Sequence, residues 1–185
     1  FKQKTAYEIV SRDWSSDVCS SDLMGRCSDI LVLGRPGADP ENVAPATVEA
    51  ALYECARAVM IAPPKAGEGG FNSVVVAWNG SFQAARSLEY SLPFLTKASK
   101  VTLLVVGSKP DDVGASYLQR NLGRHGINVA IDAIDPGAVS ARARGRDLLN
   151  YTHEKGADLL VMGAYGRGQV LSFLGLGGAT AKVIS

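Results

Sequence analysis

Short runs of β-branched and aliphatic residues alternate with longer amphipathic stretches along the second half of the chain. This alternation is typical of βαβ units, which build a parallel sheet. The predicted strands are Val74 to Ala77, Val101 to Val106, Val129 to Ile134 and Leu159 to Met162. The pattern therefore predicts an α/β fold.

Three helices are predicted between these strands. In the first, apolar residues recur at helical spacing from Ala84 to Leu95, and Ser81 is placed to cap the start. The second is predicted over Asp111 to Arg124, with acidic residues in its first turn, where the helix dipole favours them. The third is predicted over Ala138 to Lys155, and Gly156 after it is a natural C-terminal stop.

The earlier part of the chain carries a shorter version of the same pattern. It predicts a strand at Ile30 to Leu33, a helix at about Ala46 to Arg57 and a strand at Val59 to Ala62. Asp29 to Gly37 matches Asp158 to Gly166 with one constant offset of 129 residues. A pattern shared at that distance indicates an internal repeat of domain size.

Residues 1–23 share neither the periodicity nor the composition of the rest of the chain. Lys2 to Ile9 and Asp13 to Leu23 correspond to the translation of two parts of a sequencing-library adapter, in the correct order. We therefore interpret residues 1–23 as an artefact and set them aside before reasoning about the fold.

The remaining chain is interpreted as one domain and part of another. Residues 24–64 form the C-terminal remnant of a first domain, and residues 65–72 form a linker rich in glycine and charge. Residues 73–185 form a second domain. We expect its final helix to begin near Gln169 or Ala179, so that the chain ends inside this helix and the last strand is missing.

Composition narrows the class of protein. Apolar residues make up 46% of the 185, charged residues make up 20%, and the net charge is +1, as in ordinary globular proteins. The near-neutral charge argues against a nucleic-acid or membrane-surface partner, and no apolar run approaches the ~20 residues of a membrane-spanning helix. Three cysteines without a C-x-x-C pair favour a reducing cytoplasm.

Two segments carry a resemblance to a known family. Ala77 to Arg86, followed by Ala157 to Gly166, resembles the opening and closing signatures of a universal stress protein domain. The piece from Asp29 to Pro64 resembles the last third of another such domain, so the chain is similar to a fragment of a tandem-domain member. The resemblance implies a doubly wound parallel sheet of order 3-2-1-4-5, of the adenine nucleotide alpha hydrolase-like type. Helices would cover both faces, and the second domain would lack strand five.

Many members of this family bind ATP through a G-x2-G-x9-G-[ST] loop, whose backbone amides hold the phosphates. Gly163 and Gly166 match the first half of that motif. Ten residues rather than nine then precede Gly177, and Gly178 stands where a serine or threonine is expected. Thr180 lies close enough in sequence to supply one hydroxyl.

By the same resemblance, Asn79 corresponds to the family's adenine-side aspartate and Val106 to the apolar residue after strand two. Asparagine can still form hydrogen bonds but carries no charge. The candidate nucleotide-binding residues are Asn79, Val106, Gly163, Gly166, Gly177, Gly178 and Thr180. The alternative is that these glycines serve only a tight turn and close helix packing. Gly34 and Gly37 in the first domain have no matching downstream glycine, so we expect that copy not to bind.

Other candidate chemistry is sparse. His125 and His153 lie near predicted helix ends without metal-ligand spacing, which indicates surface or capping roles. We expect Cys27 and Cys55 to pack as small apolar residues. The motifs of hydrolases, P-loop NTPases and dinucleotide-binding proteins do not occur in the sequence.

Three arginines, Arg142, Arg144 and Arg146, are expected to form a solvated helix face, with the first and third on one side. The leading interpretation is a non-enzymatic stress-response module without a cofactor. It would act through dimerisation, as a homo-oligomer or as an intramolecular domain pair. The alternatives are an ATP-binding stress switch and, with least support, a small-molecule enzyme.

Overall fold

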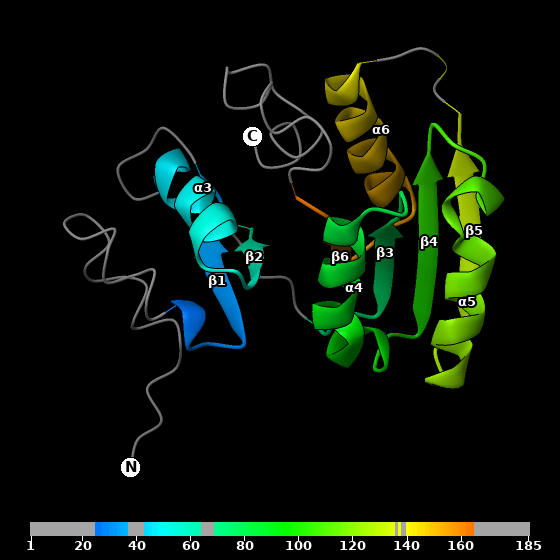
Figure 1. The fold of residues 1–185 in the computed structure, drawn as a ribbon, viewed down its shortest axis with the longest axis horizontal. Coiled ribbons are helices and arrows are strands. Elements are labelled where there is room, and N and C mark those ends of the chain that lie inside the picture. The colour runs from blue at the N-terminus through cyan, green and yellow to red at the C-terminus, as the bar shows by residue number, and fades with distance from the viewer. Residues whose placement is uncertain (1–24, 37–42, 64–68, 136, 138–139, 165–185) are drawn as a thin grey trace. The chain divides into compact units, whose positions relative to one another are not determined.

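The computed structural model describes residues 25–36, 43–63, 69–135, 137 and 140–164. The chain divides into two compact units, with the division after Gly67 (Figure 1). The predictions for residues 1–23, for residues 65–68 of the linker and for a helix near Gln169 or Ala179 lie outside the described residues.

The first unit contains the strand, helix and strand predicted from the repeat. They are β1 (Ile30–Gly34), α3 (Pro45–Glu54) and β2 (Ala58–Ala62). The two strands are parallel, with Ile30 opposite Ala58. Pro45 occupies the first helical position, where a missing N–H costs nothing. The small core between helix and strands consists of Leu31, Leu33, Val48, Ala51 and Cys55.

The second unit is built on a parallel sheet of four strands. These are β3 (Ser73–Ala77), β4 (Lys100–Val106), β5 (Val129–Ile134) and β6 (Leu159–Val161). Their spatial order is β5-β4-β3-β6, which is 3-2-1-4 in the order of the chain. This order confirms the predicted doubly wound arrangement for the first four strands. β4 is buried along nearly its whole length, which explains its continuous apolar run.

Helices cover both faces of this sheet (Figure 1). On one face, α4 (Phe82–Leu95) and α5 (Ala115–Arg124) pack against alternate strand residues such as Val74 and Val76. On the opposite face, Leu148 and Tyr151 of α6 (Ala141–Glu154) pack against Val75 and Leu104. Successive strand residues therefore belong to two separate hydrophobic cores, one on each face of the sheet, because side chains alternate between the faces of a strand.

The predicted cap of α4 and the predicted stop after α6 agree with the structure, and α6 has an N-terminal cap that was not predicted. Ser81 begins α4, and its side-chain oxygen accepts a hydrogen bond from the Ala84 N–H at 3.2 Å. Ser140 does the same for α6 through the Ala143 N–H, so this helix starts three residues later than predicted. Gly156 follows α6 with a φ of 59°, as a C-terminal stop requires.

The prediction of one continuous helix from Asp111 to Arg124 is wrong. A short 3-10 helix, η1 (Asp111–Val113), comes first and is separated from α5 by Gly114, whose φ of 69° is left-handed. A left-handed residue breaks the run of helical hydrogen bonds. The acidic residues Asp111 and Asp112 therefore lie in η1 and not in the first turn of α5.

Asp158, the first residue of the second copy of the repeated motif, connects β6 to β3. Its carboxylate accepts hydrogen bonds from the backbone N–H groups of Asn72 and Ser73, at 2.9 and 2.8 Å. The Asp158 N–H in turn donates to the Ser73 carbonyl at 2.8 Å. These contacts set the start of β6 beside the start of β3. Within the described ranges β6 pairs only with β3, and β2 pairs only with β1.

Candidate functional site

The carboxyl ends of β3, β4 and β6 meet at one edge of the sheet. From β3 the chain builds β4 and β5 outward on one side and then returns to place β6 on the other. The gap beyond β3 and β6 is therefore a topological switch point, where open α/β sheets usually bind ligands. Asn79 follows β3, Val106 ends β4, and Gly163 follows β6. The other candidates, Gly166, Gly177, Gly178 and Thr180, lie outside the described residues.

Asn79 takes part in the turn that leads from β3 into α4. Its side-chain oxygen accepts a hydrogen bond from the backbone N–H of Ser81 at 3.1 Å, and Gly80 between them has a φ of 69°. The oxygen of this exposed side chain is thus used by the turn. The side-chain NH2 is the group that Asn79 could offer to a ligand.

Trp78 connects this turn to the next loop at the same edge. Its indole N–H donates to the Val113 carbonyl at 2.8 Å, and its ring packs against the core beneath α4 and α5. A side chain at Gly80 would come within 3.4 Å of the same carbonyl. The turns after β3 and β4 are therefore held against each other. The sequence analysis missed this contact. The available signal was Trp78 itself, a large aromatic residue directly before Asn79.

Gly163 lies directly against the first turn of α4. A Cβ atom there would come within 2.6 Å of the Ala84 nitrogen and 2.8 Å of the Gln83 carbonyl carbon, distances that real Cβ atoms do not show. The Ala84 N–H is already bonded to Ser81. Close packing of β6 on α4 therefore accounts for this glycine without any ligand.

Val106 faces α6 and is partly buried against the core there. The following residue, Gly107, has a φ of 74° and donates its N–H to the Ile134 carbonyl at 2.9 Å. This bond holds the ends of β4 and β5 together. Val106 thus lies one strand away from Asn79, as the register of β3 and β4 requires.

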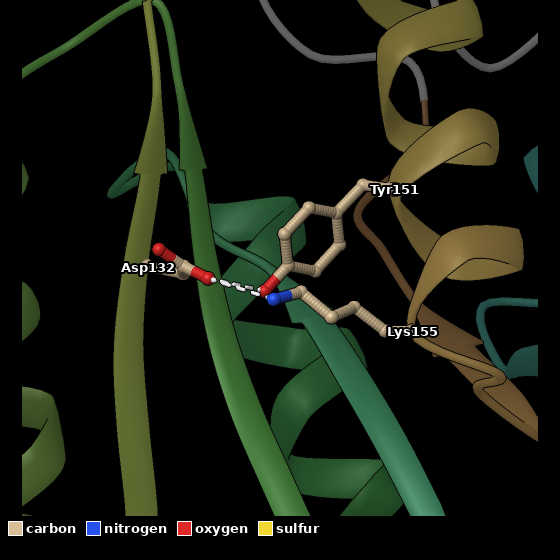
Figure 2. Close-up of polar contacts among 3 residues, drawn as sticks. All are labelled: Asp132, Tyr151 and Lys155. Carbon is tan, nitrogen blue, oxygen red and sulfur yellow. Dashed lines mark hydrogen bonds and ion pairs between the residues drawn. The ribbon is translucent and has the colours of Figure 1, made fainter.

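A polar group between β5 and α6 is the second notable feature of this unit (Figure 2). The Tyr151 hydroxyl donates to the Asp132 carboxylate at 2.6 Å, and the Lys155 ammonium lies 3.7 Å from the same oxygen. Lys155 also lies 5.2 Å from the centre of the Tyr151 ring. The sequence analysis missed this group, although an aspartate within an apolar strand and a tyrosine and lysine four residues apart were visible.

The two acidic groups of this cluster respond in opposite directions. Burial, followed by the hydrogen bond to Asp132, raises the pKa of Tyr151 well above its ordinary value. The Tyr151 hydrogen bond and then the positive charge of Lys155 lower the pKa of Asp132, although some desolvation opposes them. Tyr151 keeps its proton and Asp132 keeps its charge near neutral pH. The arrangement suits a structural clamp and not a group that exchanges protons.

Two adjoining hollows run along α6. The larger, of about 520 Å³, lies beside the end of β5 and is lined by Ile134, Tyr151 and the polar residues Asn150 and Glu154, among others. The smaller, of about 250 Å³, is lined by Ser140, Arg142, Ala143 and Arg146. Ala143 and Arg146 line both, so the hollows form one groove. Asn79, Val106 and Gly163 are not among the lining residues.

The histidines and arginines lie where the sequence predicted. His125 ends α5 and His153 lies in the last turn of α6, and both side chains are exposed. Arg142, Arg144 and Arg146 are exposed on α6, with the first and third beside the same hollow.

The two cysteines in the described residues differ. Cys55 is buried in the core of the first unit, as predicted, whereas Cys27 is exposed, so that prediction is wrong for Cys27. Gly25, two residues earlier, lies so close to Cys55 that an added Cβ atom would come within 2.7 Å of the Cys55 sulfur. Across the described segments, no three histidine, cysteine or acidic side chains come together as a metal site. None of the helices there is long and apolar enough to cross a membrane.

Comparisons with known proteins bear on the fold. No family model and no curated protein sequence matches the chain. A universal stress protein from Archaeoglobus fulgidus DSM 4304 matches 90% of this chain with a TM-score of 0.67 and 21% identity. This chain spans 60% of that protein. Protein Rv1636 from Mycobacterium tuberculosis H37Rv matches 63% of this chain and 89% of its own, with 23% identity and a TM-score of 0.45. The chain is thus an α/β protein with parallel sheets and the fold of a universal stress protein.

Proposed function

We propose that this chain is a universal stress protein, part of a tandem-domain parent, that works in the cytoplasm as a non-enzymatic, dimerising module. The observation that carries the proposal is the switch point of the β5-β4-β3-β6 sheet, where Gly163 packs directly against α4. The fold shared with the Archaeoglobus protein supports the family assignment. The partner is a second stress protein domain, in the same chain or in another copy, and not nucleic acid.

The polar groups of the second unit support a role without catalysis. Asp132 and Tyr151 are hydrogen-bonded to each other. Burial and this hydrogen bond raise the pKa of Tyr151, whereas a tyrosine that acts as a general base needs a lowered pKa. The side-chain oxygen of Asn79 and the Ala84 N–H in the first turn of α4 are both bonded within the protein. The residues at the switch point are thus arranged to hold the edge together.

The test is sedimentation of the full chain over a concentration series, combined with a phosphate-release assay in Mg-ATP. We expect reversible dimers and no phosphate release above that of buffer. Turnover that saturates with ATP concentration would contradict the proposal, and a strictly monomeric chain would exclude pairing between two copies.

A second candidate function is an ATP-binding stress switch that uses a degenerate G-x2-G-x10-G-G loop. It is favoured by one observation, the placement of Asn79, Val106 and Gly163 at the carboxyl ends of three neighbouring strands. In that case Mg-ATP would shift the monomer–dimer equilibrium at micromolar nucleotide concentration.

A further inference from the structure

We propose that Asn79 is a site of spontaneous covalent modification, where the backbone nitrogen of Gly80 displaces the side-chain amide of Asn79. The inference goes beyond the proposed function and does not depend on it. The chain contains one Asn-Gly pair, and it lies in the turn between β3 and α4. Because glycine has no Cβ atom, no side chain on Gly80 hinders its nitrogen as a nucleophile.

The groups that would react are accessible to water. Asn79 and Gly80 are both exposed. Within the described part of the chain, no hydrogen bond uses the Gly80 N–H or the side-chain NH2 of Asn79. Water can therefore reach both the nitrogen that attacks and the amide group that leaves.

The turn also activates the carbon atom that is attacked. The Asn79 Oδ1 accepts a hydrogen bond from the Ser81 N–H at 3.1 Å. This bond closes a ring that includes the Asn79 Cγ and the Gly80 nitrogen, so the side chain is folded back over the peptide group that attacks it. Oδ1 becomes negative when Cγ is attacked, and a donor already in place at that oxygen lowers the barrier.

The reaction needs water and no other reactant. The Gly80 nitrogen gives its proton to solvent and forms a bond to Cγ, while an electron pair of the carbonyl bond moves to Oδ1. When that pair returns, the bond from Cγ to Nδ2 breaks, and ammonia leaves with a proton from solvent. Water then opens the cyclic imide at Cγ to give aspartate, or at the backbone carbonyl carbon to give isoaspartate.

The two products should affect the fold differently. Aspartate keeps an oxygen that accepts from the Ser81 N–H, and its charge is favourable near the start of α4. Isoaspartate places an extra methylene group in the main chain between β3 and α4. The bond of Trp78 to Val113 and the close packing of Gly163 leave little room for it. The isoaspartate form should therefore unfold at a lower urea concentration than the fresh chain, and Asn79→Asp should not.

The first experiment follows the full chain by peptide mapping and mass spectrometry during incubation at neutral pH. A synthetic peptide of residues 76–83 gives the rate for an unconstrained Asn-Gly pair. Asn72 is the control within the chain. It is also exposed, but the N–H that follows it, that of Ser73, donates to the Asp158 carboxylate at 2.8 Å.

We expect Asn79 of the folded chain to convert at a rate within about tenfold of that of the peptide, and Asn72 to convert more slowly than Asn79. Conversion of Asn79 that is more than about tenfold slower than in the peptide would overturn the inference. Conversion of Asn72 as fast as that of Asn79 would also overturn it.

The second experiment tests the contribution of the Ser81 N–H. Ser81→Pro removes this N–H, and the Ser81 φ of −80° is close to the value that proline requires. Ser81→Ala keeps the N–H and removes the cap hydroxyl. We expect Ser81→Pro to slow the conversion of Asn79 by about tenfold, and Ser81→Ala to leave it within about threefold.

Circular dichroism checks that both Ser81 variants are folded. Equal rates of Asn79 conversion in the two variants would overturn the activating role of the Ser81 N–H. If Ser81→Pro does not fold, the comparison of Asn79 with Asn72 and with the peptide still decides the inference.

Discussion

Among the described glycines of the second unit, Gly163 has the least room for a side chain. Its neighbours on α4 are backbone atoms, Ala84 N and Gln83 C, which cannot rotate away from an added methyl group. We expect Gly163→Ala to lower the free energy of unfolding by about 1–3 kcal/mol, because β6 must move away from α4. Urea unfolding followed by circular dichroism measures this loss.

The matched control is Gly123→Ala in α5, where a Cβ atom meets nothing within 4 Å. This change should be neutral or raise stability by about 0.5–1 kcal/mol, since alanine is the better helix former. Equal stability of the two variants would show that Gly163 is not required for packing, and would restore it as a candidate ligand residue.

The Tyr151–Asp132 hydrogen bond predicts a dependence of stability on pH. The folded-state pKa of Asp132 lies below its ordinary value of 3.8, so its contribution is present above pH 3.8 and is lost as the pH falls through the folded value. The pKa of Tyr151 is raised, so its contribution is present below its ordinary value of 10.0 and is lost above it. Stability from this pair should be greatest between these two limits.

Tyr151→Phe removes the hydrogen bond and keeps the ring. We expect a loss of about 0.5–1 kcal/mol near pH 7, kept small because the Asp132 side chain is 47% exposed and solvent can replace its partner. The difference in the free energy of unfolding between wild type and variant, measured by urea unfolding from pH 2.5 to 8, should become smaller below about pH 4. A difference that grows on acidification would contradict the assigned direction of the shift.

At the scale of elements, the break between η1 and α5 depends on one backbone conformation. Gly114 has a φ of 69°, and its N–H donates to the Asp111 carbonyl at 3.1 Å. We expect Gly114→Ala to cost about 1–2 kcal/mol, because an alanine side chain disfavours the left-handed region. Thermal unfolding of the variant is the measurement.

Gly114→Asn separates conformation from helix propensity. Asparagine tolerates the left-handed region better than alanine but is a poorer helix former. We therefore expect Gly114→Asn to be more stable than Gly114→Ala. The reverse order would mean that η1 and α5 can merge into the continuous helix that the sequence pattern suggested.

At the scale of the whole molecule, we expect the full chain to bind Mg-ATP with a dissociation constant in the millimolar range. The extra residue between Gly166 and Gly177 shifts the following segment by about 1.5 Å if it is helical, Gly178 removes a hydroxyl, and Asn79 carries no charge. Each loss of ~1.4 kcal/mol weakens binding tenfold. Isothermal titration calorimetry measures the affinity.

Deletion of Leu176 combined with Gly178→Ser restores the family spacing and hydroxyl, and should tighten Mg-ATP binding if the spacing argument holds. Gly178→Ser alone is the matched control and should improve binding by no more than about tenfold. A low micromolar dissociation constant for the unmodified chain would favour the ATP-binding switch.

The sequence alone determined the elements, because their signals are local. The β-branched runs placed β3 to β6 within a residue, the serine before α4 marked its start, and the repeated aspartate motif placed β1 and β6 at a constant offset. The resemblance supplied the strand order. Asn79, Val106 and Gly163 could be assigned to one sheet edge from these features.

Only the tertiary structure decided what those residues touch. Contacts such as Trp78 with Val113, Gly163 with Ala84 and Tyr151 with Asp132 join segments separated by 19 to 79 residues in the chain. No local pattern encodes such pairs, because they depend on which strands become neighbours and on how closely their turns approach. The left-handed break at Gly114 was missed for a different reason, because a glycine within a helical pattern can be either helical or left-handed and the sequence does not say which.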